Sequence, residues 1–214
     1  LTILGGSIGY GMRWKKPDDW FQFFVTGSYQ NYDINNFGSI FAFANGVSNN
    51  LAITTSIVRD SKSGNPIFPS GGSRLGITTR FTPGGLLTLN KDFTGLSEQD
   101  KFRWAQYHKW KFTTEWYTPL GGGRDEEGGQ KLVLFAKVGV GYLGRFNNTL
   151  GDSPFERFYL GGSALTGFQL DGREIIALRG YDDLSLSPTT GATFINKYTM
   201  ELRYLLSPNP SATI

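Results

Sequence analysis

Hydrophobic and polar residues alternate with a period of two along most of this chain, which is the pattern of β-strands with one apolar face. In the first segment, Leu4, Ile8 and Tyr10 share one face, while Ser7 and Arg13 share the other. Seven such segments are visible, and an eighth opens near the C-terminal end. They cover residues 4–14, 20–32, 50–60, 73–81, 108–118, 131–144 and 193–206, with the eighth at 212–214. The alternation predicts an all-β protein.

The lengths of the segments and of their connections indicate a membrane protein. Many segments reach roughly 10 residues, the length of a membrane-spanning strand, whereas strands of soluble proteins average about 5–6. Short connections at 15–19, 61–72, 119–130 and 206–210 alternate with long ones at 33–49, 83–107 and 145–192. This alternation is typical of outer-membrane barrels. Tryptophans near strand ends suit an interfacial girdle, namely Trp14, Trp20, Trp110 and Trp116. We therefore predict a transmembrane antiparallel β-barrel whose apolar rows face lipid.

Composition narrows the function classes further. The 214 residues carry a net charge of +3 without a basic run, which argues against a nucleic-acid partner. There is no cysteine and only one histidine, His108, so disulfides, the usual zinc sites and a Ser-His-acid hydrolase are not favoured. We expect no catalytic residue, no metal site and no cofactor. His108 is interpreted as a girdle or loop-base residue.

The connection at 145–192 is long and rich in Arg, Phe and Tyr for an ordinary outer loop. Near its end lies the sequence LRGYDD, which contains Arg179, Gly180 and Tyr181. If this loop folds back into a wet lumen, the planar guanidinium of Arg179 suits a bidentate carboxylate partner. Glu201 and Glu115 lie on the polar rows of their strands and are the candidate partners. We predict that this contact tethers the loop.

Three stretches carry a resemblance to a known family: NPIFPSGGSRLGITTRF, FERFYLGGSALTGF and LRGYDD. Together they resemble the BamA family, the central subunits of the outer-membrane β-barrel assembly machine, over about residues 50–205. The similarity is strongest in a Phe-Pro-x-x-Gly turn and a Phe-Tyr-x-Gly-Gly element. Their residues are Phe68, Pro69 and Gly72, and Phe158, Tyr159, Gly161 and Gly162.

The resemblance implies a specific architecture. Residues 1–214 would form part of one C-terminal barrel domain, about strands 6–13 of a 16-stranded barrel, without the flanking strands or the periplasmic repeats. A long loop between the eleventh and twelfth strands of the family carries an Arg-Gly-aromatic signature and folds into the barrel. That signature maps onto Arg179, Gly180 and Tyr181.

The position of the signature differs from the family pattern. In the family, Arg-Gly-aromatic closely follows the Gly-Gly pair, and here that place reads Thr166-Gly167-Phe168. The Arg version comes thirteen residues later, at Arg179. The segment Thr166–Phe168 is therefore a rival for the motif, and Arg173 is a second candidate for the tether.

The resemblance also implies a function. The family assembles β-barrel proteins and inserts them into the outer membrane of Gram-negative cells, non-enzymatically and without ATP. The implied partners are unfolded outer-membrane β-barrel clients, accessory subunits of the assembly machine and outer-membrane lipid. Two other functions stay open: a two-partner-secretion-type export pore of the same superfamily, and a passive porin or uptake barrel.

Overall fold

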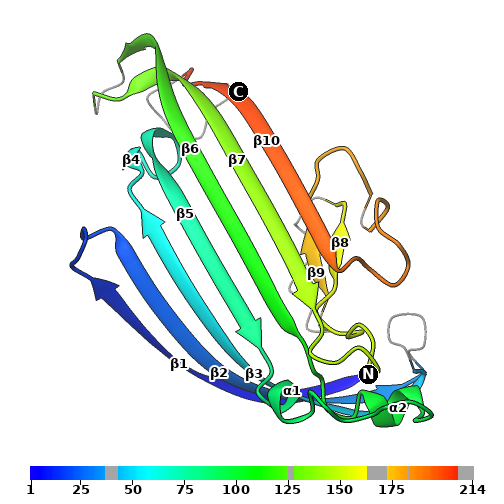
Figure 1. The fold of residues 1–214 in the computed structure, drawn as a ribbon. Helices are drawn as coiled ribbons and strands as arrows, with labels where there is room; N and C mark the ends of the chain where they lie inside the picture. Colours follow the sequence, from blue (N-terminus) through cyan, green and yellow to red (C-terminus); the bar gives the residue numbers. More distant parts are fainter. Residues whose placement is uncertain (37–42, 125–127, 163–172, 183, 207–214) are drawn as a thin grey trace.

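The computed structural model describes residues 1–36, 43–124, 128–162, 173–182 and 184–206. One antiparallel sheet with the strand order β1-β2-β3-β5-β6-β7-β10 dominates it, and β4 pairs with β5 (Figure 1). The strands are β1 (Thr2–Trp14), β2 (Phe21–Asn35), β3 (Asn45–Asp60), β4 (Ser63–Gly64), β5 (Pro69–Phe81), β6 (His108–Arg124), β7 (Gln130–Gly144) and β10 (Phe194–Tyr204). The sheet curves, and within the described residues β1 and β10 do not pair. The predicted all-β partial barrel is confirmed.

Two predicted boundaries are wrong. The segment 33–49 was predicted as a long loop, but β2 continues to Asn35 and β3 begins at Asn45, with the two strands paired throughout. Polar side chains stabilise this extension, because Tyr29 Oη and Asn31 Nδ2 both donate to Asn49 Oδ1, at 2.8 and 2.9 Å. The connection at 119–130 is likewise shortened by strand, since β6 runs to Arg124. The predicted strand at 212–214 lies outside the described residues.

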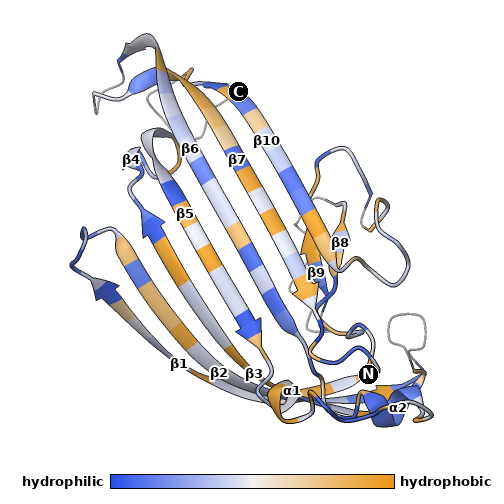
Figure 2. Ribbon diagram, viewed as in Figure 1, coloured by the Kyte–Doolittle hydropathy of each residue, from blue (hydrophilic) through white to orange (hydrophobic). Residues whose placement is uncertain are grey.

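Hydrophobic and hydrophilic residues alternate along the strands, which Figure 2 shows as bands, and successive side chains of a strand point to opposite faces of the sheet. On β10 the apolar row Tyr198, Met200 and Leu202 is 63–75% exposed. On β6, Trp110 and Trp116 of the apolar row are also exposed. No second sheet covers these rows in the parts of the chain that the structure describes, as it would in a soluble sandwich. The exposed rows match the lipid-facing surface of a barrel.

The long connections hold the remaining elements. The β5–β6 connection contains two short helices, α1 (Gly84–Leu87) and α2 (Glu98–Lys101). The β7–β10 connection contains β8 (Phe158–Leu160) and β9 (Glu174–Ile176), which pair in parallel beside the ends of β7 and β10 (Figure 1). Among the helices described, none has the length and apolar character needed to cross a membrane.

Buried side chains gather at both ends of the sheet. The larger cluster lies where the long connections meet the strands, and it comprises Tyr32, Ile34, Phe43, Phe93, Phe102, Ala105, Tyr107, Leu143, Leu150, Phe155 and Phe158. The smaller cluster lies at the short-turn end and comprises Phe68, Tyr117, Val133, Phe135 and Leu205. Phe68, the first residue of the Phe-Pro-x-x-Gly turn, thus packs against the wall. Gly72 of that turn has φ +87°, and a Cβ there would lie 2.2 Å from the Ser61 carbonyl oxygen, so only glycine fits.

Candidate functional site: the loop on the inner wall

The loop between β7 and β10 lies directly against the polar face of the sheet. Phe158 of β8 is 1% exposed. A Cβ placed on Gly141 of β7 would lie 2.6 Å from Cζ of the Phe158 ring, so the ring packs on bare backbone. This close approach requires glycine at position 141. The predicted inward-folding loop is therefore present, and an aromatic ring seats it on the wall.

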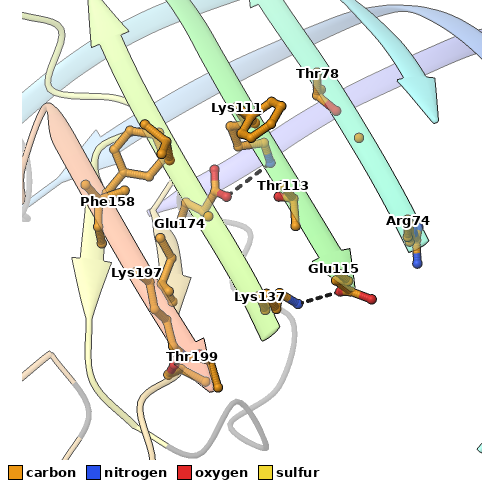
Figure 3. Close-up of a pocket in the computed structure, with 18 of the residues that line it drawn as sticks. Arg74, Thr78, Lys111, Thr113, Glu115, Lys137, Phe158, Glu174, Lys197 and Thr199 are labelled. Atoms are coloured by element: carbon orange, nitrogen blue, oxygen red, sulfur yellow. Dashed lines mark hydrogen bonds and ion pairs between the residues drawn. The ribbon is translucent and has the colours of Figure 1, made fainter. Parts of the chain in front are cut away.

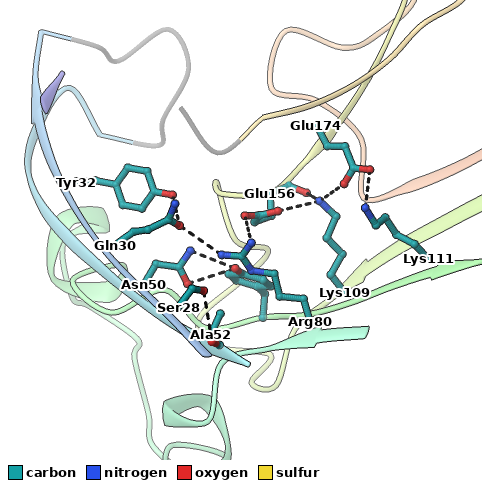
Figure 4. A network of polar contacts seen from close by, with 11 residues as sticks. Ser28, Gln30, Tyr32, Asn50, Ala52, Arg80, Lys109, Lys111, Glu156 and Glu174 are labelled. Atoms are coloured by element: carbon teal, nitrogen blue, oxygen red, sulfur yellow. Dashed lines mark hydrogen bonds and ion pairs between the residues drawn. The ribbon is translucent and has the colours of Figure 1, made fainter. Parts of the chain in front are cut away.

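A buried lysine lies at the centre of the polar contacts beside this ring (Figure 4). Lys109 of β6 has a side chain only 3% exposed, and its ammonium nitrogen lies 3.0 Å from Glu156 Oε2 and 2.6 Å from Glu174 Oε2. The same nitrogen donates to the Glu156 carbonyl oxygen at 2.8 Å and lies 4.6 Å from the centroid of the Phe158 ring. Charged and hydrogen-bonded partners compensate for the desolvation of this ammonium.

Two further wall cations extend the contact. Arg80 Nη1 of β5 lies 3.2 Å from Glu156 Oε1, and Lys111 Nζ of β6 lies 3.1 Å from Glu174 Oε1. Burial opposes the ionisation of Glu174, but the charges of Lys109 and Lys111 outweigh it and hold the pKa of this carboxyl below its ordinary value. We call this group the loop brace. It comprises Glu156 and Glu174 of the loop and Arg80, Lys109 and Lys111 of the wall.

The backbone at Glu156 is unusual in a way that bears on the brace. Glu156 has φ +64°, in the left-handed region that non-glycine residues rarely adopt. Such a conformation costs of order 1–3 kcal/mol and persists where surrounding contacts impose it. The bonds from Arg80 and Lys109 to this residue supply those contacts. The unusual backbone and the ion pairs of the brace thus coincide at Glu156.

Next to the brace, the loop and the wall line an open pocket of about 530 Å³ (Figure 3). Its lining is mixed, and the charged side chains in it come from both the wall and the loop: Arg74, Lys111, Glu115, Lys137, Glu174 and Lys197. Lys197 of β10 also donates to the Ala177 carbonyl oxygen of the loop. Such charged side chains suit a face that meets water, because lipid would penalise them.

The residues predicted to form the tether have other surroundings in the described part of the chain. Arg179 is exposed, and among the described residues no ion pair joins it to Glu115 or Glu201. Instead, Glu115 Oε1 lies 2.9 Å from Lys137 Nζ, and Glu201 Oε2 lies 2.7 Å from Arg203 Nη2. The guanidinium of Arg173 lies 5.8 Å from the centroid of the Tyr159 ring. The rival segment Thr166–Phe168 lies outside the described residues. The tether role of Arg179 stays a prediction.

Replacing Arg179 with Ala distinguishes the predicted tether from the exposed Arg179 of the structure. In the structure it removes an exposed side chain, so we expect the free energy of unfolding to change by no more than about 0.5 kcal/mol. Urea unfolding and heat-modified gel mobility of the complete protein measure this change, with Arg173→Ala run in parallel. A larger loss in Arg179→Ala alone would instead support the tether predicted from the sequence.

The Phe-Tyr-x-Gly-Gly element shapes the loop. Tyr159 is buried, and Gly161 and Gly162 have φ +127° and +87°. A Cβ on Gly161 would lie 2.4 Å from the Asp182 carbonyl oxygen, so this glycine lets two parts of the loop cross closely. The Gly162 N–H donates to the carbonyl of Tyr181, which joins the element to the Arg-Gly-Tyr sequence. Gly180 has φ +85°, and Tyr181 is exposed.

Sequence reasoning missed the brace. The alternation puts Lys109 and Lys111 on the polar row of their strand, which fits solvated or lumen charges without a partner, and Glu156 and Glu174 were given no role. The available signal was Glu156 itself, a lone acid between two phenylalanines in FERF. Its partner lies 47 residues earlier in the chain, a separation that no local pattern reveals.

The lone histidine belongs to the outer surface. His108 lies on the outward row of β6, where Trp110 Nε1 donates to its Nδ1 at 3.0 Å and the Tyr142 ring lies 5.9 Å away. These contacts match a girdle residue. Within the described ranges, no group of three or more His, Asp or Glu residues could hold a metal ion.

A curved antiparallel sheet with exposed apolar rows, a charged inner face and a loop seated on that face defines the wall of an outer-membrane β-barrel. The sequence matches the Omp85 superfamily domain over residues 2–213, and the chain belongs to this superfamily. A comparison with curated proteins finds no match.

Among solved structures, the fold is similar to the crystal structure of BamA from Haemophilus ducreyi lacking POTRA domains 1–3. The TM-score is 0.60 at 16% sequence identity, with 94% of this chain covered. This chain spans 37% of the length of that protein. At this identity the likeness extends to the fold alone, and it confirms the BamA-like barrel predicted from the sequence motifs.

Proposed function

We propose that this chain forms the wall of an outer-membrane insertase, which assembles β-barrel proteins and inserts them into the outer membrane without ATP and without a catalytic residue. The loop brace carries this proposal. It holds the long loop against the inner wall by ion pairs around the buried Lys109, so this part of the wall is a fixed support for a client that adds elsewhere in the barrel. Superfamily membership and the BamA-like fold support the same reading.

The proposed partners are unfolded outer-membrane β-barrel clients, accessory subunits of the assembly machine and outer-membrane lipid. In this mechanism a client strand adds to an unpaired strand edge elsewhere in the barrel, because free backbone N–H and C=O groups template a new strand. The braced wall stays paired and gives that edge a fixed support. No covalent bond forms or breaks, so the accelerated step is the folding of the client into lipid.

Reconstitution tests this function. The complete protein that contains this chain is placed in lipid vesicles, and a urea-denatured client barrel is added without ATP. We expect the client to fold faster than in empty vesicles or in vesicles with an unrelated barrel, as measured by its gel mobility and its protection from protease. Transfer of a soluble partner across the vesicle without client insertion would point to an export pore. Ion conductance alone would point to a passive porin.

A further inference from the structure

The connection between β5 and β6 carries an exposed apolar ridge. Leu86 and Leu87 end α1, and Leu89 follows two residues later; their exposed fractions are 52%, 89% and 48%. Single exposed leucines are ordinary on protein surfaces, but large apolar side chains gathered in one short segment mark a contact surface. We call these three residues the leucine ridge.

The ridge is continuous with the lipid-facing rows of the sheet. A Cβ on Gly85 of α1 would lie 2.1 Å from a carbon of the Phe146 ring, so this ring packs on the α1 backbone. The Phe146 ring in turn meets the His108 ring edge-on at 5.2 Å, and Trp110 of the outward row donates to His108. This chain of contacts places α1 at the rim of the outward face, where β5 and β6 end (Figure 1).

A buried amide fixes the orientation of the ridge. Asn147 is 5% exposed, and its Nδ2 donates to the carbonyl oxygens of Thr88, Leu89 and Lys91 at 2.9, 3.1 and 2.7 Å. The Thr88 hydroxyl group also bonds back to the Gly84 carbonyl oxygen. Because the backbone is already ordered, presenting these leucines to a partner costs little further conformational entropy.

We propose that the leucine ridge inserts into the lipid leaflet on the long-loop side and anchors the rim of the barrel there. Lipid is the occupant that fits, because the ridge extends a surface that already faces hydrocarbon. Lys91 lies two residues after Leu89 and is exposed, with its ammonium 5.2 Å from the centroid of the Phe93 ring. Leucines beside a lysine suit the boundary between acyl chains and anionic headgroups.

Site-specific fluorescence tests the insertion, and the chain has no native cysteine to interfere. Leu87→Cys in the complete protein is labelled with bimane and placed in phosphatidylethanolamine–phosphatidylglycerol vesicles. We expect brominated acyl chains to quench this label strongly and aqueous iodide to quench it weakly. The matched control is Glu98→Cys, an exposed polar position on α2 of the same connection, where iodide should dominate.

Two results would overturn the proposal. Equal iodide quenching at both positions would mean that the ridge stays in water. Protection of the Leu87→Cys label from both quenchers would mean that protein covers the ridge instead of lipid. Gel mobility first confirms that each variant folds. We expect both to fold, because the native side chains at the two positions are exposed. The experiment measures contact with lipid, so its result does not depend on the proposed insertase function.

Discussion

Lys109→Met should release the β7–β10 loop from the inner wall. The substitution removes a buried ammonium that lies within 3.0 Å of carboxylate oxygens of both Glu156 and Glu174. Breaking a buried ion pair on one side costs about 3–5 kcal/mol, and we expect the lower end because Arg80 and Lys111 still face the two acids. Urea unfolding of the complete protein in detergent measures the loss, and protease cleavage within the loop should become faster.

The matched control is Lys137→Met on β7. Lys137 also pairs with an acid across the inner wall, Glu115, but its side chain is 43% exposed, so we expect a loss below about 1 kcal/mol. A charge exchange then tests the pairing itself. Lys109→Glu and Glu156→Lys should each destabilise the protein, and the double variant should recover part of the loss, with a coupling of roughly 0.5–3 kcal/mol. Strict additivity of the two single effects would contradict the brace.

Gly141→Ala is the second substitution with a large expected effect. The new Cβ would lie 2.6 Å from the Phe158 ring and 3.0 Å from Ile195 Cγ2, and the ring cannot move aside because it is buried. We expect overpacking to cost about 1–3 kcal/mol and to lift β8 off the wall. Urea unfolding gives the cost. A cysteine placed at Ile176, which is half-buried beside the ring, should react faster with maleimide once the loop lifts.

Gly139→Ala provides the control for this variant. Gly139 lies two residues earlier on the same inner row of β7, and a Cβ there would meet only the Lys197 carbonyl oxygen, at an ordinary 4.0 Å. Alanine also suits a strand better than glycine, so stability should be unchanged or slightly higher. Equal losses in the two variants would mean that glycine is needed for the strand and not for the docking of Phe158.

The wall of this barrel could be predicted from the sequence because the pattern that produces a strand lies within a few neighbouring residues. Each strand of a barrel meets lipid on one face and water on the other, so the side chains alternate within a window of a few residues. The prediction is wrong at 33–49, which was interpreted as a long polar connection. There the strands are stabilised by side-chain hydrogen bonds such as Asn31 to Asn49, which join residues 18 positions apart.

The partners in the brace could not be predicted, because the sequence does not tell which side of an ion pair, loop or wall, carries the positive charge. The family pattern suggested a cation on the loop and acids on the wall, and in the structure Glu156 and Glu174 of the loop meet cations of the wall. The attraction between the two charges is the same whichever side carries the cation. Glu174 and Lys111 lie 63 residues apart, so only the tertiary fold brings them together.

The brace also has a mechanical consequence. Arg80 of β5 pairs with Glu156, which precedes β8, whereas Lys109 and Lys111 of β6 pair with Glu174 of β9. The loop therefore contacts two neighbouring wall strands at once. Sliding β5 along β6 would break these contacts together with the backbone ladder that already joins the strands. The ion pairs of the brace therefore add to the resistance against shear between β5 and β6. When the barrel deforms, we expect the distortion to concentrate in strands that the loop brace does not contact.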